Sequence, residues 1–299
     1  MPCICYAPHR FSPNAMALIN SVNDIVSDYQ RDGYRLTLRQ LYYQFVARGL
    51  LPNAVQSYKR LGAMVSDARL AGLVDWEMIE DRTRGTVVPP TWDGPADIIG
   101  SAAKQYQIDR WRDQPCRPEV WCEKEALAGV LEGTCGDLGV PHLSCRGYAS
   151  LSEMWASAQR LRRAEAAGQK TIVFHLGDHD PSGLDMTRDV RERLRLLGSR
   201  AGVRRLALNI NQIRKYSPPP NPAKVTDARF AAYRKKYGTN SWELDALEPS
   251  VLQALVRKAV ESLRDEELWK AAVQREERER ARIRAAAERW EEIESLLGA

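Results

Sequence analysis

The feature that most constrains the fold of this chain is an apolar run that ends in two closely spaced carboxylates. Residues 171–174 read Thr-Ile-Val-Phe, and the chain continues as His-Leu and then as Gly-Asp-His-Asp-Pro-Ser-Gly over residues 177–183. A continuous apolar run is typical of a strand that is buried on both faces of a parallel sheet. Because side chains alternate along an extended segment, Asp178 and Asp180 are predicted to point to one side and His179 to the other.

A helix is predicted directly after these carboxylates. Pro181 and Gly183 end the strand, and residues 184–190 have helical spacing. The carboxylates therefore lie at the carboxyl end of a strand, where open α/β sheets bind their ligands.

A third carboxylate occupies an equivalent position upstream. Residues 119–122 predict a short strand, and residues 123–131 predict a turn into a helix, which places Glu123 at the strand end. Taken alone, Glu123 is better interpreted as part of a solvated helix N-terminus favoured by the helix dipole. Beside Asp178 and Asp180, however, it completes an all-oxygen cluster at the ends of two neighbouring strands, and such a cluster suits Mg²⁺.

These residues resemble a known family. Glu-Lys-Glu-Ala at residues 123–126, followed further along the chain by the motif at 177–183, resembles the Toprim domain of the A subunit of topoisomerase VI. It is also similar to the related meiotic double-strand-break transesterase. The resemblance implies that Glu123, Asp178 and Asp180 hold Mg²⁺, and that a winged-helix domain with a catalytic tyrosine precedes the Toprim domain.

The N-terminal region contains a candidate for that tyrosine. Residues 36–45 are similar to the family's Arg-x-x-Tyr-Tyr helix, in which the second aromatic residue is the nucleophile. Tyr42 shares the i, i+3, i+4, i+7 apolar stripe of this helix and is predicted to pack in the core. Tyr43 lies about 100° round the helix, on a face predicted to be exposed and shared with Arg39. Tyr43 is thus the candidate nucleophile and Arg39 the group that stabilises developing charge, although a surface tyrosine that contacts phosphate is the alternative.

The surrounding pattern predicts a winged helix. Helices are expected over residues 14–29, 37–48 and 54–70, followed by a strand over 74–80 and a wing turn over 81–85. The third helix carries three cations off its apolar face, as expected of a helix that enters the major groove of DNA. A solvated helix face is the alternative. These candidate DNA-binding residues are Lys59, Arg60 and Arg69.

Downstream, the strand and helix signals alternate. Strands are expected over residues 140–145 and 202–209, and a capping box at Ser150 opens a helix that ends before Gly168. The order β-α-β-α-β-α-β predicts a parallel, doubly wound sheet, so the fold class is α/β with an α-rich winged helix. Arg146, at the end of the second strand, either faces DNA phosphate or belongs to a loop anchored by the following glycine.

We expect four segments along the chain. They are a winged-helix DNA-binding domain over 1–88, a linker over 89–115, a Toprim metal-binding core over 116–216 and a helical extension over 217–299.

Two further features lie in the extension. Residues 229–237 interleave cations with aromatic residues, which suits backbone contact and stacking with nucleic acid, although a solvated helix with packed aromatics is equally consistent. Glu243 and Asp245 are carboxylates that could approach the metal site, although most surface carboxylates have no such role.

Charge and composition are consistent with this interpretation. The 299 residues carry a net charge of +5, which favours a polyanionic partner without deciding the matter. No apolar run approaches membrane-spanning length, and the N-terminus lacks the pattern of a signal peptide, so a cytoplasmic protein without membrane contact is expected. The cysteines lack zinc-finger spacing and are expected to be reduced thiols.

The predicted function is Mg²⁺-dependent cleavage of double-stranded DNA by tyrosine transesterification. The resemblance implies a 5′-phosphotyrosine on Tyr43 and a homodimer in which the tyrosine of one protomer meets the metal site of the other. No phosphate-binding Gly-rich loop of the ATPase type is present, so strand passage would need a separate ATPase subunit. The alternatives are a Toprim nuclease that hydrolyses DNA, with Tyr43 as a contact residue, and a DNA-binding accessory protein without catalytic activity.

Overall fold

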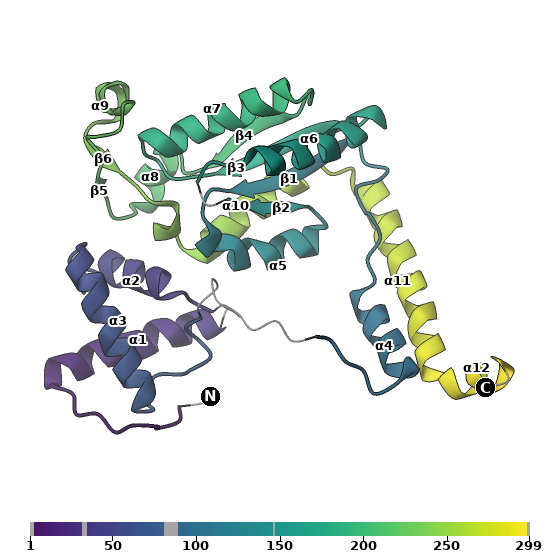
Figure 1. The fold of residues 1–299 in the computed structure, drawn as a ribbon, viewed down its shortest axis with the longest axis horizontal. Helices are drawn as coiled ribbons and strands as arrows, with labels where there is room; N and C mark the ends of the chain where they lie inside the picture. The colour runs from purple at the N-terminus through teal and green to yellow at the C-terminus, as the bar shows by residue number, and fades with distance from the viewer. Residues whose placement is uncertain (1–2, 32–34, 81–88, 146, 298–299) are drawn as a thin grey trace.

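The computed structural model describes residues 3–31, 35–80, 89–145 and 147–297 (Figure 1). A four-stranded sheet, in the order β2-β1-β3-β4, forms its centre, and every neighbouring pair of strands is parallel. The predicted parallel α/β sheet is therefore confirmed. Its strands are β1 (Cys116–Cys122), β2 (His142–Ser144), β3 (Lys170–Leu176) and β4 (Gly202–Ala207).

Helices cover both faces of this sheet, which explains why β3 is buried over residues 171–176 and apolar over residues 172–174 (Figure 1). Ile172 and Phe174 are buried on the face covered by α5 and α10, whereas Trp121 and Val173 are buried on the face covered by α6 and α7. A strand that contributes side chains to two cores cannot alternate with polar residues. The covering helices are α5 (Ala128–Leu138), α6 (Leu151–Ala166), α7 (Pro181–Leu196) and α10 (Pro249–Glu261).

Three helices form the N-terminal module, close to their predicted bounds: α1 (Pro13–Arg31), α2 (Leu38–Ala47) and α3 (Val55–Leu70). Thr37 begins α2 with a capping box, since its side chain accepts from the backbone N–H of Gln40 and the Gln40 side chain accepts from the backbone N–H of Thr37. Leu41 and Phe45 of α2 are completely buried against α1 and α3. Apolar packing therefore holds α2 in place.

The strand predicted over residues 74–80 is wrong. In the described part of the chain this segment forms a single parallel bridge, between Ile79 and Leu36. Val74, Met78 and Ile79 are all buried, so the side chains do not alternate between two environments as those of a strand would. The wing turn predicted over 81–85 lies outside the described residues, and a winged helix stays a prediction.

The remaining elements extend the molecule in two directions (Figure 1). α4 (Pro95–Gln105) lies within the segment 89–115 that was expected to be a linker, and it packs along α11 (Glu266–Glu288), which is followed by α12 (Trp290–Leu297). At the carboxyl edge of the sheet lie η1 (Glu125–Leu127), α8 (Ile210–Tyr216), β5 (Asn221–Pro222), α9 (Phe230–Tyr237), β6 (Asn240–Ser241) and η2 (Leu244–Ala246). Among the described residues, no helix has the length and apolar character needed to cross a membrane.

Candidate active site

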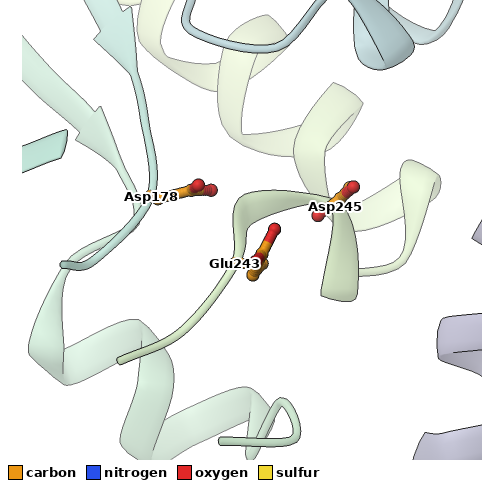
Figure 2. Close-up of side chains that lie close together, drawn as sticks. All are labelled: Asp178, Glu243 and Asp245. Carbon is orange, nitrogen blue, oxygen red and sulfur yellow. The ribbon is translucent and has the colours of Figure 1, made fainter. Parts of the chain in front are cut away.

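Three carboxylates meet at the carboxyl end of β3. Asp178 follows β3 directly, and Figure 2 shows it extending toward the segment that carries Glu243 and Asp245. One oxygen of each carboxylate lies within 4.8 Å of the others. The side chain of Asp245 is fully buried, and those of Asp178 and Glu243 are 13% and 27% exposed. This acidic cluster, Asp178, Glu243 and Asp245, is a site that can hold a metal ion.

Backbone pairing brings the two segments of the acidic cluster together. The N–H of His179 donates to Trp242 O at 2.8 Å, and the N–H of Trp242 donates back to His179 O at 3.1 Å. Asp178 Oδ1 then accepts from the backbone N–H of Leu244 at 2.7 Å. The sequence contains Glu243 and Asp245 as a closely spaced pair, but this long-range pairing is what places them beside Asp178.

Lys124 lies at the centre of the acidic cluster, a role that its sequence context did not predict. Its Nζ is 3.1 Å from Asp178 Oδ1 and 2.8 Å from Asp245 Oδ1, and it also contacts Glu243, so its ammonium group lies among the three carboxylates that could hold a metal ion. Although burial opposes its charged form, the surrounding carboxylates, with Asp245 foremost, raise the pKa of Lys124 above its usual value. A protonated lysine therefore offsets part of the negative charge.

Glu123 joins the same site from the end of β1. Its Oε2 accepts from the backbone N–H of Asp178 at 2.9 Å. Burial and the Asp178 carboxylate raise the pKa of Glu123 to about 7. Burial likewise raises the pKa of Asp178 to about 6, against the opposing effect of Lys124. Both shifts mean that burial makes the ionised forms of these two carboxylates costly.

Two glycines allow this close approach. A Cβ on Gly177 would lie 2.7 Å from Glu123 Oε2, and a Cβ on Gly183 would lie 2.3 Å from the carbonyl oxygen of Asp178. Neither position has space for a side chain. The glycines of the 177–183 motif are therefore required for Glu123 to contact the Asp178 backbone.

Asp180 and His179 lie as the alternation predicts. Asp180 lines the same cavity as Glu123 and Asp178, and its side chain caps α7 by accepting from the backbone N–H of Gly183 at 2.6 Å. His179 is 1% exposed, and its Nδ1 lies 3.0 Å from the hydroxyl of Tyr233. The histidine is used for packing, while the carboxylates on either side of it reach the cavity.

A cavity of about 610 Å³ separates this acidic end of the sheet from α2. Glu123, Asp178 and Glu243 line one side, and Tyr42 and Tyr43 line the other.

Arg39 joins the two sides of the cavity. Its Nη2 lies 3.4 Å from the hydroxyl of Tyr43 and its Nε lies 2.8 Å from Asp245 Oδ2. A second ion pair joins its Nη2 to Glu243 at 2.5 Å. The predicted proximity of Arg39 to Tyr43 is confirmed, and the same guanidinium also contacts the acidic cluster.

The two adjacent tyrosines have different surroundings. The Tyr42 hydroxyl accepts from the backbone N–H of Ala54 at 2.8 Å, and its ring packs edge-on against Tyr58. Among the described residues, the Tyr43 hydroxyl has Arg39 as its hydrogen-bond partner. Tyr42 is thus a core residue, as predicted, and Tyr43 lines the cavity with its hydroxyl beside Arg39.

The prediction that Tyr43 lies on an exposed face is wrong, because Tyr43 is only 5% exposed. The segment that carries Glu243 and Asp245 packs against α2 and covers this face of the helix. Burial, together with these two carboxylates, raises the pKa of Tyr43 to about 12. The hydroxyl is therefore protonated in the resting protein.

The predicted DNA-binding residues have unequal exposure. Lys59 and Arg60 are exposed on α3. Arg69 is partly buried, since its guanidinium lies 4.7 Å from the centre of the Trp76 ring and donates to the Trp76 carbonyl. Arg146 lies outside the described residues. Arg69 therefore packs against Trp76, whereas Lys59 and Arg60 extend into solvent.

The chemistry of the site fits a hard divalent cation. Its candidate ligands are all carboxylate oxygens, which Mg²⁺ prefers, and burial raises the pKa values of Glu123 and Asp178, so a bound cation would favour their ionised forms. The residues that would hold Mg²⁺ include the predicted Glu123, Asp178 and Asp180, with Glu243 and Asp245 beside them. In comparisons with known proteins, no family model matches this chain, and no curated protein matches it.

Proposed function

We propose that this protein cleaves DNA with Mg²⁺, using Tyr43 as the nucleophile. The observation that carries the proposal is the shared cavity, which Tyr43 lines together with Glu123, Asp178 and Asp180. Arg39 contacts both sides, so a phosphate placed between them would meet a nucleophile, a cation and the metal-binding residues together. The resemblance of the motifs to the topoisomerase VI A subunit supports the same chemistry.

Each side chain has a role in this reaction. Glu123, Asp178 and Asp180 would hold Mg²⁺, which when bound supplies positive charge to the scissile phosphate. The Tyr43 oxygen forms a bond to phosphorus, and the bond from phosphorus to the 3′ oxygen breaks. Because the pKa of Tyr43 is raised to about 12, its proton must pass to solvent during the attack, and a proton from solvent completes the leaving 3′ oxygen.

The products are a 5′-phosphotyrosine and a 3′-hydroxyl that has taken up a proton. Arg39 stabilises the charge that develops on the phosphate oxygens, and the burial of Tyr43 limits competition from water. Within a single chain, Tyr43 already lies beside the acidic cluster. The homodimer and the separate ATPase subunit stay predictions.

Hydrolysis is the second candidate, and the raised pKa of Tyr43 is the observation that favours it. A tyrosine with a pKa near 12 is a poorer nucleophile at neutral pH than a metal-activated water. In that reaction a water activated by a metal ion at the acidic cluster would be the nucleophile, and Tyr43 would only contact the phosphate.

Covalent trapping separates the two candidates. The protein is incubated with end-labelled duplex DNA and Mg²⁺, denatured, and examined for protein attached to a 5′ end. Tyr43→Phe should abolish both cleavage and the adduct, whereas the matched control Tyr42→Phe should retain both. Cleavage without an adduct, retained by Tyr43→Phe, would establish hydrolysis and exclude the tyrosine mechanism.

A further inference from the structure

One segment of this chain, next to the candidate active site, is strongly basic. Residues 209–241, here called the basic segment, contain seven Lys and Arg residues and one Asp, which gives a net charge of +6 against +5 for the whole chain. Residues 3–80, which include the helix predicted to bind DNA, contain eight basic and seven acidic side chains. Of these two regions, the basic segment therefore attracts a polyanionic partner more strongly.

Six of the seven cations in the basic segment are exposed and have no carboxylate partner among the residues that the structure describes. The seventh, Arg229, pairs with Asp227 and Asp185. The free six are Arg214, Lys215, Lys224, Arg234, Lys235 and Lys236. Cations that are neither paired nor buried are available to phosphate groups.

The aromatic residues of α9 are used to anchor the helix. The Tyr233 hydroxyl donates to the carbonyl oxygen of His179 at 2.9 Å, and the Tyr237 ring packs edge-on against the His179 imidazole at 4.7 Å. One face of α9 is thus fixed to the loop between Asp178 and Asp180, and the cations Arg234, Lys235 and Lys236 remain exposed. Because the aromatic rings are engaged in packing, the available interaction is with phosphates and not base stacking.

The basic segment also reaches the cavity. Asn221, Pro222, Lys224 and Ser241 line it together with Tyr43 and Asp178. Figure 1 shows α9, β5 and β6 at the same end of the molecule as α2 and α3, whereas α11 lies at the opposite end. A strand that follows these cations is led toward the candidate active site.

We propose that the basic segment, and not α3, provides the main surface for the DNA backbone and guides it into the cavity. This inference rests on the proposed function only in taking DNA as the partner. The contacts are to phosphates, so they are independent of base sequence and weaken with salt. The anchoring of α9 on His179 couples this surface directly to the loop that carries Asp178 and Asp180.

The test compares the salt dependence of DNA affinity for variants with equal changes in charge. Fluorescence anisotropy is recorded with a labelled duplex in Ca²⁺ or EDTA, so that binding is measured without cleavage. The first variant combines Arg234→Ala, Lys235→Ala and Lys236→Ala. The matched control combines Arg278→Ala, Arg282→Ala and Arg284→Ala, three exposed cations on α11. All six substitutions place a strong helix former on an exposed helical position, and circular dichroism checks the fold.

In the α9 variant, the slope of log affinity against log salt should become less steep by about 2 to 3 units. In the α11 control the slope should not change. An unchanged slope for the α9 variant, an equal change in both variants, or no DNA binding by the wild-type protein would each overturn the inference. A wild-type protein that binds through α9 but never cuts DNA would contradict the proposed function alone. If the wild-type protein cleaves DNA but the α9 variant has the wild-type salt dependence, the proposed function stands and the assignment of the basic segment as the DNA surface is wrong.

Discussion

The two sides of the cavity are held in place by different forces. Tyr43 projects from α2, a helix fixed by the apolar packing of Leu41 and Phe45, which are completely buried. The opposite side gathers Asp178 and Asp245 from segments far apart in the sequence, and Lys124 and backbone N–H groups hold these charges together. The tyrosine side should therefore be sensitive to changes in packing, and the carboxylate side to changes in charge.

The largest expected effect is on the carboxylate side. Asp178→Asn keeps an oxygen that can accept from Leu244 N–H but removes a charged ligand, so Mg²⁺-dependent cleavage should fall to background while the fold is retained. Cleavage assays and calorimetric Mg²⁺ binding measure the two effects. Asp137→Asn, on the exposed surface of α5, is the control and should behave as the wild type. If Asp178→Asn cuts DNA at the wild-type rate, the metal assignment is wrong.

Removing the central cation tests whether charge balance holds this side together. Among the described residues, Lys124→Met leaves Arg39 as the one cation paired with the fully buried Asp245, and it should lower the free energy of unfolding by about 3 to 5 kcal/mol. Mg²⁺ should restore part of this loss, because a bound cation supplies the missing charge. Urea unfolding with and without Mg²⁺ measures both quantities.

The exposed Lys59→Met is the control for this experiment, and it should change stability by less than about 0.5 kcal/mol. A Lys124→Met protein as stable as the wild type would show that packing, and not charge balance, holds the acidic cluster.

The pH dependence of Mg²⁺ binding follows from the pKa of Glu123, which is raised from its usual value of 4.5 to about 7. Mg²⁺ needs the ionised carboxylate, so its affinity should fall as the pH falls through 7, by up to about tenfold per unit for one proton. Binding near pH 6.5 should release protons, which calorimetry in buffers of different ionisation enthalpy detects. An affinity that does not change with pH in this range would contradict the crowding of Glu123 and Asp178.

The metal-free protein should show the opposite trend in stability. Since the folded state binds the Glu123 proton more tightly than the unfolded chain does, the stabilising contribution is complete below the usual pKa and is lost as the pH rises through about 7. Glu123→Gln, which cannot ionise, is the control and should remove this contribution to the pH dependence of unfolding.

The smallest expected effects are those of the two tyrosine substitutions on the stability of the protein. Tyr42→Phe removes the acceptor of the Ala54 N–H and should lower the free energy of unfolding by about 1 kcal/mol. Among the described residues, Tyr43→Phe loses the 3.4 Å hydrogen bond from Arg39. It should change the free energy of unfolding by less than about 0.5 kcal/mol. Urea unfolding measures both values. A larger loss for Tyr43→Phe would mean that its hydroxyl supports the fold and not only the cavity.

Several features of the fold and site were predictable from local sequence. The apolar run of β3, the break at Pro181 and the helix α7 follow from residues adjacent in the chain, and so does the packing of Tyr42 in the core. The alternation along 178–180 also predicted that the two aspartates would share a side. Each of these predictions needs only the periodicity of a strand or a helix.

The strand prediction over 74–80 is wrong because a strand also needs a neighbouring strand to pair with. The alternating sequence pattern does not show where such a neighbour lies. The burial of Tyr43 was missed for a similar reason. The helical phase of α2 gives the direction of the side chain, but the segment that covers it comes from the far end of the chain.

The sequence by itself thus determined the strand that ends in carboxylates, the helices on either side and the residue types available for chemistry. Only the tertiary structure decided that Lys124, Glu243 and Asp245 meet Asp178, and that Arg39 joins them to the tyrosine. The physical reason is that periodicity encodes burial along a single element. The pairing of His179 with Trp242 and the compensation of buried charge instead depend on which distant segments come into contact.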